Sequence, residues 1–192
     1  MAQAPKIPSD APNSTLKDPN PAAAGLGADL DEDSIFERTV TINRPRHELY
    51  AFWRDFRNLP MFMEDIESVS VIDELRSHWR VKAPADFSAE WNSIVVQDVP
   101  GELIAWQSGE DASIKNSGRI EFRESPNGRG TLVTATIAYE PPGGKLGKIF
   151  ASLFQREPKI QARQDLRRFK QLMETGEIST AEAPAAAPRG EG

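Results

Sequence analysis

The sequence predicts an α+β domain in which a curved antiparallel sheet of about seven strands packs against a long C-terminal helix. Three observations lead to this fold class. A strand-like segment followed by helical spacing opens the ordered part of the chain. Apolar residues between 66 and 139 then recur with a period of two, and turn signals separate the runs. After Lys145 the apolar period becomes helical.

The first predicted elements are a strand over residues 35–43, rich in β-branched side chains, and one or two short helices after it. Asn43 is a residue type that caps helices, and Pro45 suits a first helical turn. Apolar residues then recur at helical spacing, namely Leu49, Phe52 and Trp53. The Asn-Leu-Pro sequence at 58–60 interrupts this run.

Six further strands are predicted from alternating apolar and polar residues, over 66–72, 75–81, 87–99, 103–107, 114–122 and 131–139. Short turn signals lie between them, among them Ala83-Pro84, Pro100-Gly101 and Pro126-Asn127-Gly128. Short turns between strands of this kind are typical of successive antiparallel hairpins, so we expect a meander.

The last element is a helix from about Lys145 to Gly176, with a kink or a new start at Pro158. Its apolar stripe comprises Leu146, Ile149, Phe150, Leu153, Phe154, Ala162, Leu166, Phe169 and Met173. A strongly twisted sheet can wrap around such a helix, and a cavity remains wherever side chains do not fill the space between them.

Both ends of the chain have the composition of disordered segments. Residues 1–33 combine five prolines with an acidic cluster, and residues 178–192 are rich in alanine and proline. We therefore expect one folded domain over residues 34–177, which suits a chain of 192 residues.

Composition excludes several classes of function. The chain has no cysteine, which excludes a disulfide framework, a thiol nucleophile and a cysteine-ligated metal site. Its formal net charge of -6 argues against general nucleic-acid binding. No apolar run is long enough to cross a bilayer, and no secretory signal is visible, so we expect a cytoplasmic protein without a transmembrane segment.

Several local phrases, in this order, resemble the START-like superfamily, which is also called SRPBCC. They are PRHELYAFW at 45–53, NLPMF at 58–62, SHWR at 77–80, IAWQS at 104–108, NSGRIEF at 116–122, YEPPGG at 139–144 and DLRRFKQLMETGE at 165–177. The resemblance covers roughly residues 34–178 and is strongest to polyketide cyclase/dehydrase-like and coenzyme Q-binding START-type proteins. It implies the helix-grip fold, with a ligand between the concave face of the sheet and the long helix.

The predicted pocket is lined by aromatic and small side chains from several strands and from the helix that faces them. These residues are Trp79, Trp91, Ser93, Trp106, Phe122, Val133, Ile137, Tyr139, Phe150 and Phe154. Aromatic side chains offer large apolar areas with few rotatable bonds, which suits a planar ring or an isoprenoid chain. Each of them is also an ordinary core residue type, so the pocket interpretation depends on the set.

Acid-base chemistry has few candidates in this sequence. They are His47, His78, Ser93, Asn116, Glu121 and Tyr139. His78 alternates with Trp79 and should point away from the face that Trp79 occupies. No GxSxG, HExxH or GxGxxG motif is present, and the glycine-lysine segment at 143–148 lacks the spacing and the Ser/Thr of a phosphate loop, so no cofactor or metal is expected.

These observations favour binding or carrying of a hydrophobic small molecule, such as a lipid, a quinone or a polyketide-like compound. A cyclase or dehydrase in which Tyr139 or Glu121 assists proton transfer is the alternative. A third reading uses the basic residues of the final helix to contact an anionic membrane or ribosomal RNA. These residues are Lys145, Lys148, Arg156, Lys159, Arg163, Arg167, Arg168 and Lys170. A solvated helix face explains the same charges.

Overall fold

The computed structural model describes residues 35–82, 88–110, 112, 115–140 and 158–178. The described elements follow the chain as β1 (Ile35–Ile42), α1 (Arg46–Arg54), η3 (Phe56–Met61), β2 (Ile66–Val71), β3 (Arg76–Lys82), β4 (Ser88–Val99), β5 (Leu103–Ser108), β6 (Lys115–Glu124), β7 (Thr131–Glu140) and α3 (Pro158–Thr175). Every strand predicted from the period of two is present, within about two residues at its ends.

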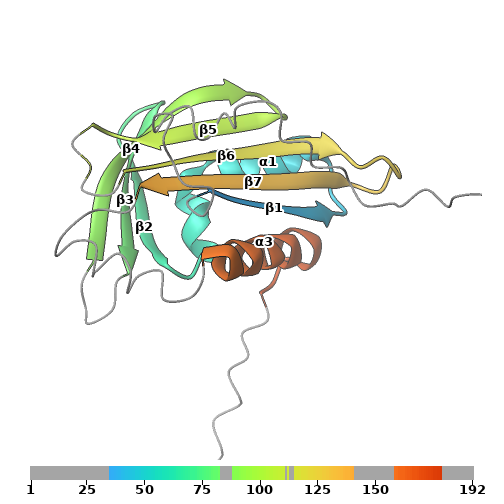
Figure 1. The fold of residues 1–192 in the computed structure, drawn as a ribbon. Coiled ribbons are helices and arrows are strands. Elements are labelled where there is room, and N and C mark those ends of the chain that lie inside the picture. Colours follow the sequence, from blue (N-terminus) through green and yellow to red (C-terminus); the bar gives the residue numbers. More distant parts are fainter. Residues whose placement is uncertain (1–34, 83–87, 111, 113–114, 141–157, 179–192) are drawn as a thin grey trace, which may run out of the picture.

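The strands form one antiparallel seven-stranded sheet in the order β1-β7-β6-β5-β4-β3-β2. Strands β2 to β7 pair with their sequence neighbours, as a meander requires, and β1 closes the far edge by pairing with β7. The sheet curls strongly, and α3 lies beside β1 at its open side (Figure 1). The predicted α+β helix-grip architecture is confirmed. The predicted tails and the part of the final helix before Pro158 lie outside the described residues.

The start of α1 differs from the prediction. Pro45 is the N-cap residue and makes no side-chain cap, whereas Asn43 uses its backbone N–H to bond Glu174 Oε1 at 2.7 Å. Glu174 also accepts a bond of 2.6 Å from Lys170 Nζ. The end of β1 is therefore bonded to the last turn of α3, so Asn43 serves a long-range contact that local spacing does not reveal.

Aromatic side chains join the three helical elements into one core. Phe169 of α3 meets Trp53 of α1 at a ring distance of 5.0 Å and Phe62, which follows η3, at 4.9 Å. All three side chains are almost completely buried, as is Leu166. The apolar stripe predicted for this part of α3 is therefore the face that packs inward.

A glycine closes the β6–β7 hairpin against β1. Gly130 has a φ of +75°, and a Cβ built on it would lie 2.0 Å from the carbonyl oxygen of Ile42. Only glycine tolerates both the left-handed backbone and this approach. This position fixes the end of β1 next to the turn.

A carboxylate at the surface attaches α1 to the sheet. Asp98, which follows a bulge in β4, accepts a hydrogen bond from the hydroxyl of Tyr50 and one of 2.6 Å from Arg54 Nε. Burial, together with the hydrogen bond and the charge of Asp98, raises the pKa of Tyr50 to about 12.

We expect Asp98→Ala to lower the free energy of unfolding by about 1–2 kcal/mol, because both helical side chains lose a charge-assisted bond. Urea denaturation measures this loss, and a spectroscopic titration should show the pKa of Tyr50 moving down. Glu102→Ala is the matched control, since it removes an exposed 3.1 Å pair with Arg46 and should change stability by less than about 1 kcal/mol. Equal losses in the two variants would contradict the assignment.

Candidate ligand-binding cavity

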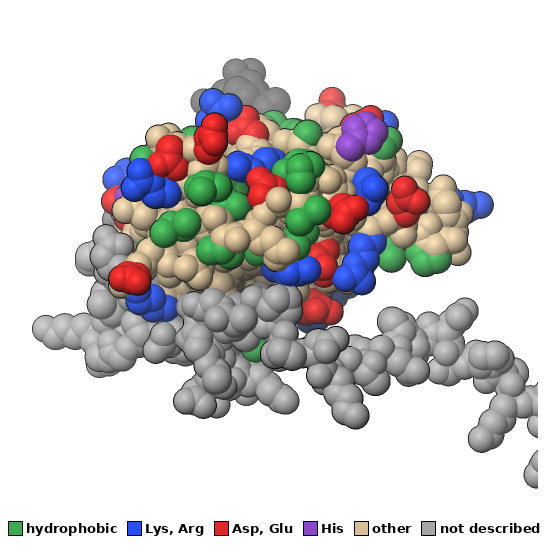
Figure 2. Space-filling model, turned by 90° about the horizontal axis from the view of Figure 1, so that it is seen from above, with side chains coloured by type: hydrophobic (Ala, Val, Ile, Leu, Met, Phe, Trp, Pro, Cys, Tyr) green, Lys and Arg blue, Asp and Glu red, His purple; other side chains and the backbone are tan. Residues whose placement is uncertain are grey.

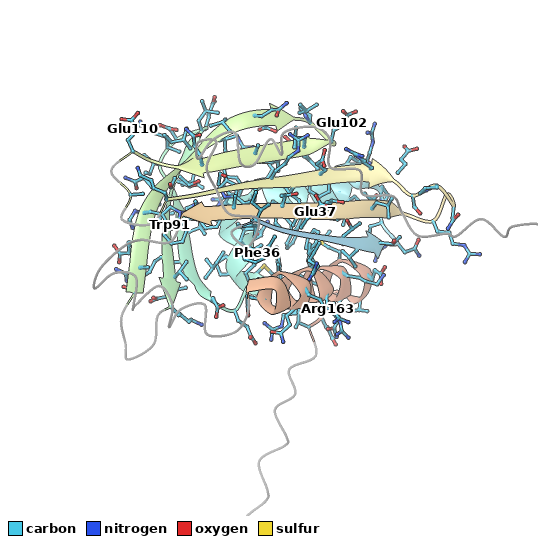
Figure 3. All side chains as sticks on the ribbon, in the orientation of Figure 1. Phe36, Glu37, Trp91, Glu102, Glu110 and Arg163 are labelled. Carbon is cyan, nitrogen blue, oxygen red and sulfur yellow. The ribbon has the colours of Figure 1, made fainter. Side chains whose placement is uncertain are left out.

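A cavity of about 200 Å³ lies between the inner face of the sheet and α3. The described residues that line it are mostly apolar and come from both ends of the sheet, from α1 and η3, and from α3. They are Phe36, Trp53, Leu59, Met63, Asp65, Ile66, Trp79, Val81, Ala89, Trp91, Trp106, Asn116, Ala135, Ile137, Gln161, Ala162, Asp165 and Leu166. Phe36 lies between β1 and α3, and Trp91 lies on β4 at the strongly curved end of the sheet (Figure 3).

Three tryptophans form one wall of this cavity. Trp79 stacks on Trp91 at a ring distance of 6.2 Å and on Trp106 at 6.4 Å, with an interplanar angle of 17° in both cases. Trp79 and Trp91 are direct partners across β3 and β4, and the curl of the sheet brings Trp106 of β5 to the same side. Nearly parallel rings offer a flat apolar surface to a bound ring system.

Because Gly118 has no side chain, the indole of Trp106 has room to lie in this wall. The two residues are partners across β5 and β6, and a Cβ on Gly118 would lie 2.1 Å from Cζ2 of Trp106. The indole therefore covers the glycine, and any larger residue would have to displace it. Sequence reasoning did not single out Gly118, although an isolated glycine inside a strand pattern indicates a close approach of this kind.

The structure brings some of the predicted pocket residues together and separates others. Trp79, Trp91, Trp106 and Ile137 line the cavity. Ser93, Phe122 and Val133 are buried but are not among its lining residues. The side chain of Tyr139, together with Phe150 and Phe154, lies outside the described residues.

The polar part of the lining was not predicted, apart from Asn116. It contains two carboxyl groups, Asp65 before β2 and Asp165 on α3. Gln161, one turn earlier on α3, donates from Nε2 to Asp165 Oδ1 at 3.1 Å. The other amide atom of this residue, Oε1, is buried without a hydrogen-bond partner. A carboxylate inside the apolar stripe Ala162–Leu166–Phe169 was the signal in the sequence that could have revealed Asp165.

Burial, together with the negative charges of Asp65 and Glu64, raises the pKa of Asp165 to about 7. The charge of Arg168 and the hydrogen bond from Gln161 act in the opposite direction. Arg168 itself pairs with Glu64. Asp165 is therefore a carboxyl group that exchanges its proton near neutral pH, next to a second carboxyl group.

The other polar candidates lie elsewhere. His47 is exposed, and His78 points to the outer face of the sheet, where it contacts Asn92 at 3.0 Å. Glu121 pairs with Arg119 at 2.9 Å and Arg123 at 3.0 Å. The expectation that Glu121 assists chemistry in the pocket is not supported by this position, because its neighbours Ile120 and Phe122 face inward and it faces outward.

The surface seen in Figure 2 has acidic and basic side chains interspersed around separate apolar ones. On α3, Arg163 points away from the sheet (Figure 3), and Arg167 is also exposed. Lys170 is bound to Glu174. No helix in the described part of the chain is long and apolar enough to span a membrane. The described residues also contain no group of three or more His, Cys, Asp or Glu placed to hold a metal ion.

Comparisons with known proteins agree with this geometry. Residues 42–167 match the family described as polyketide cyclase/dehydrase and lipid transport. An uncharacterized 17.2 kDa protein of Streptomyces lincolnensis is 26% identical over 148 residues, which cover 73% of this chain and 90% of that protein.

Two crystal structures show similar folds. A Deinococcus radiodurans protein superimposes with a TM-score of 0.62 and 40% identity, covering 74% of this chain and 99% of its own. A Streptomyces aromatase/cyclase superimposes with a TM-score of 0.57 and 14% identity, covering 76% of this chain and 98% of its own. The second similarity shows the fold alone.

Proposed function

Since this chain belongs to the polyketide cyclase/dehydrase and lipid transport family, we propose that it binds and carries a hydrophobic small molecule in the cavity beneath α3. The observation that carries this proposal is the wall of three nearly parallel tryptophans around a space of about 200 Å³. Burial of apolar ligand surface supplies about 25 cal/mol per Å², and a flat ring loses little conformational freedom when it lies on such a wall. We therefore favour a compound with fused or conjugated rings, such as a polyketide-like molecule or a quinone, over a flexible lipid chain.

A cyclase or dehydrase is the second candidate, and one observation favours it. Such chemistry needs a group that gives or takes a proton near neutral pH, and Asp165 is such a group on the cavity wall. Asp65 beside it supplies a second carboxyl group. Release of an altered compound from the protein would decide in favour of this candidate.

Ala162→Leu tests the binding proposal, because it places a larger side chain in the cavity lining. The purified protein is examined by native mass spectrometry for co-purified small molecules, and any compound found is titrated back by fluorescence of the lining tryptophans. We expect the variant to lower the affinity for that compound at least about tenfold, since the leucine side chain would occupy space that the ligand needs.

Arg163→Leu is the matched control. It introduces the same side chain at the next position of α3, where the native side chain is exposed. This variant should keep the affinity of the unchanged protein. Equal loss in both variants, or a protein that retains no nonpolar compound and binds none from a panel of aromatic ligands, would contradict the proposal.

The basic face of α3 gives a further prediction that concerns macromolecular partners. Of the eight basic residues in the final helix as the sequence predicts it, Lys145, Lys148 and Arg156 lie outside the described residues, as does the side chain of Lys159. Arg168, which lies within α3, pairs with Glu64. Contact with an anionic membrane or ribosomal RNA stays a prediction.

A further inference from the structure

We propose that the polar part of the cavity, formed by Asp65, Gln161 and Asp165, receives the protonated amine of an aromatic ligand. This inference rests on the function proposed above and specifies the class of its ligand. The amine would lie among the carboxyl groups, and the ring system would lie against the tryptophan wall.

The first observation in support of an amine ligand is the charge of the side chains that line the cavity. Two carboxyl groups are among the described residues that line the cavity, and no lysine or arginine is. The charge of Arg168 reaches Asp165 and lowers its pKa, but Arg168 pairs with Glu64 and is not a lining residue. A cation is therefore attracted into this space, whereas a ligand carboxylate would be repelled by these two groups, which are partly buried and so only partly screened by water.

The second observation is that the polar side chains of the lining offer mainly hydrogen-bond acceptors to a ligand. Gln161 uses its donor, Nε2, on Asp165 Oδ1, so its buried Oε1 remains as an acceptor without a partner. Carboxylate oxygens are acceptors as well. An ammonium group has three donors and no acceptor, and so it satisfies a set of acceptors that a ketone or a carboxylate cannot satisfy.

The third observation is that the tryptophan wall lies in the same cavity as the carboxyl groups. Trp91 and Trp106 line the same cavity as Asp165, and the faces of indole rings attract cations in addition to packing on apolar surface. Trp91 Nε1, which is buried without a partner, provides one donor for an oxygen elsewhere on the ligand. A cationic nitrogen attached to a ring system fits all three features.

Isothermal titration calorimetry with three probes of the same ring and different heads tests this proposal. The probes are naphthylmethylamine, naphthalenemethanol and naphthoic acid. We expect the amine to bind about tenfold more tightly than the alcohol, and the carboxylate to bind most weakly. Near about pH 7, binding of the amine should also release protons, because the cation favours the ionised form of Asp165.

Asp165→Asn should remove this preference. It should weaken binding of the amine about tenfold, while binding of the alcohol changes less than about twofold. Asp65→Asn is the second variant and should act in the same direction. Glu177→Gln, at an exposed carboxyl group just after α3, is the matched control and should leave all three affinities unchanged.

The inference is overturned if the alcohol or the carboxylate binds the unchanged protein as tightly as the amine does. It is also overturned if Asp165→Asn weakens all three probes equally. In both cases the binding function stands, because ring compounds still enter the cavity. Failure of all three probes to bind would instead contradict the proposed function together with this inference.

Discussion

Replacing Gly118 with alanine is expected to push the Trp106 indole out of the cavity wall and to abolish high-affinity binding of ring compounds. The added Cβ would lie 2.1 Å from Cζ2 and 2.4 Å from Cε2 of Trp106, which is far inside contact distance. The backbone of β6 cannot retreat, since Gly118 is paired with Ile137 of β7 on its other side. The ring must therefore move, and it can move only into the cavity or towards its tryptophan neighbours.

We expect this substitution to cost about 1–3 kcal/mol of unfolding free energy, as overpacking does in well-packed cores. Binding of the co-purified compound should fall at least about tenfold, because the moved indole occupies the space of the ligand. Chemical denaturation and fluorescence titration measure the two effects. The lining tryptophans also report the movement directly through a change in near-UV circular dichroism.

A double-mutant cycle separates this overlap from a general effect of losing glycine in a strand. In the Trp106→Ala background the ring is gone, so adding Gly118→Ala should cost less than about 0.5 kcal/mol. An equal cost in both backgrounds would show that Trp106 does not occupy the position above Gly118.

Asp165→Asn is expected to make the protein more stable above neutral pH. The pKa of Asp165 is raised to about 7 in the folded protein from an ordinary value of 3.8. Between these two values the folded state holds a proton that the unfolded chain has released, so stability falls as the pH rises through this window. Above the pKa that Asp165 has in the folded protein, this contribution to stability is completely lost. Asparagine has no proton to release, so the variant should lack this decline.

Urea denaturation at about pH 5 and about pH 8 measures the effect. Stability of the unchanged protein should fall between these conditions by about 1–3 kcal/mol more than that of the variant. The carboxyl groups with lowered pKa do not interfere, because their contributions to stability are lost only as the pH falls below this range. These groups are Asp55, Asp73, Glu90, Glu121 and Glu174. Parallel pH profiles for both proteins would contradict the assignment of Asp165, and Glu177→Gln serves as the control.

The two expectations for Asp165→Asn run in opposite directions. The variant should gain stability at high pH and lose affinity for the aromatic amine. A carboxyl group placed in an apolar stripe of a helix costs stability unless it has a partner. A residue that is costly in the free protein and useful in the complex is what a stability–function trade-off predicts.

Much of the fold followed from local pattern. The period of two between residues 66 and 139 located every strand of the meander, and the helical stripe through Leu166 and Phe169 identified the inward face of α3. His78 was correctly assigned to the outer face, because strict alternation with Trp79 leaves no other choice. The family resemblance was confirmed by the match over residues 42–167.

The candidate site followed from the sequence only in part. Trp79, Trp91, Trp106 and Ile137 line the cavity, whereas Ser93, Phe122 and Val133 face inward without reaching it. Periodicity assigns a side chain to a face of the sheet, but it does not state how far that face lies from the helix. The distance between an inward-facing side chain and α3 depends on the curl of the whole sheet, which no short stretch of sequence encodes.

What the sequence by itself determined is the order of the elements, the inward faces that carry Trp79 and Phe169, and the aromatic character of the interior, because these depend on spacing along the chain. Only the tertiary structure decided that Asp65 and Asp165 line one cavity and that Trp106 rests on Gly118. These contacts join residues from separate elements. Their energies arise from burial and Coulomb interaction through space, which depend on distances that the fold sets.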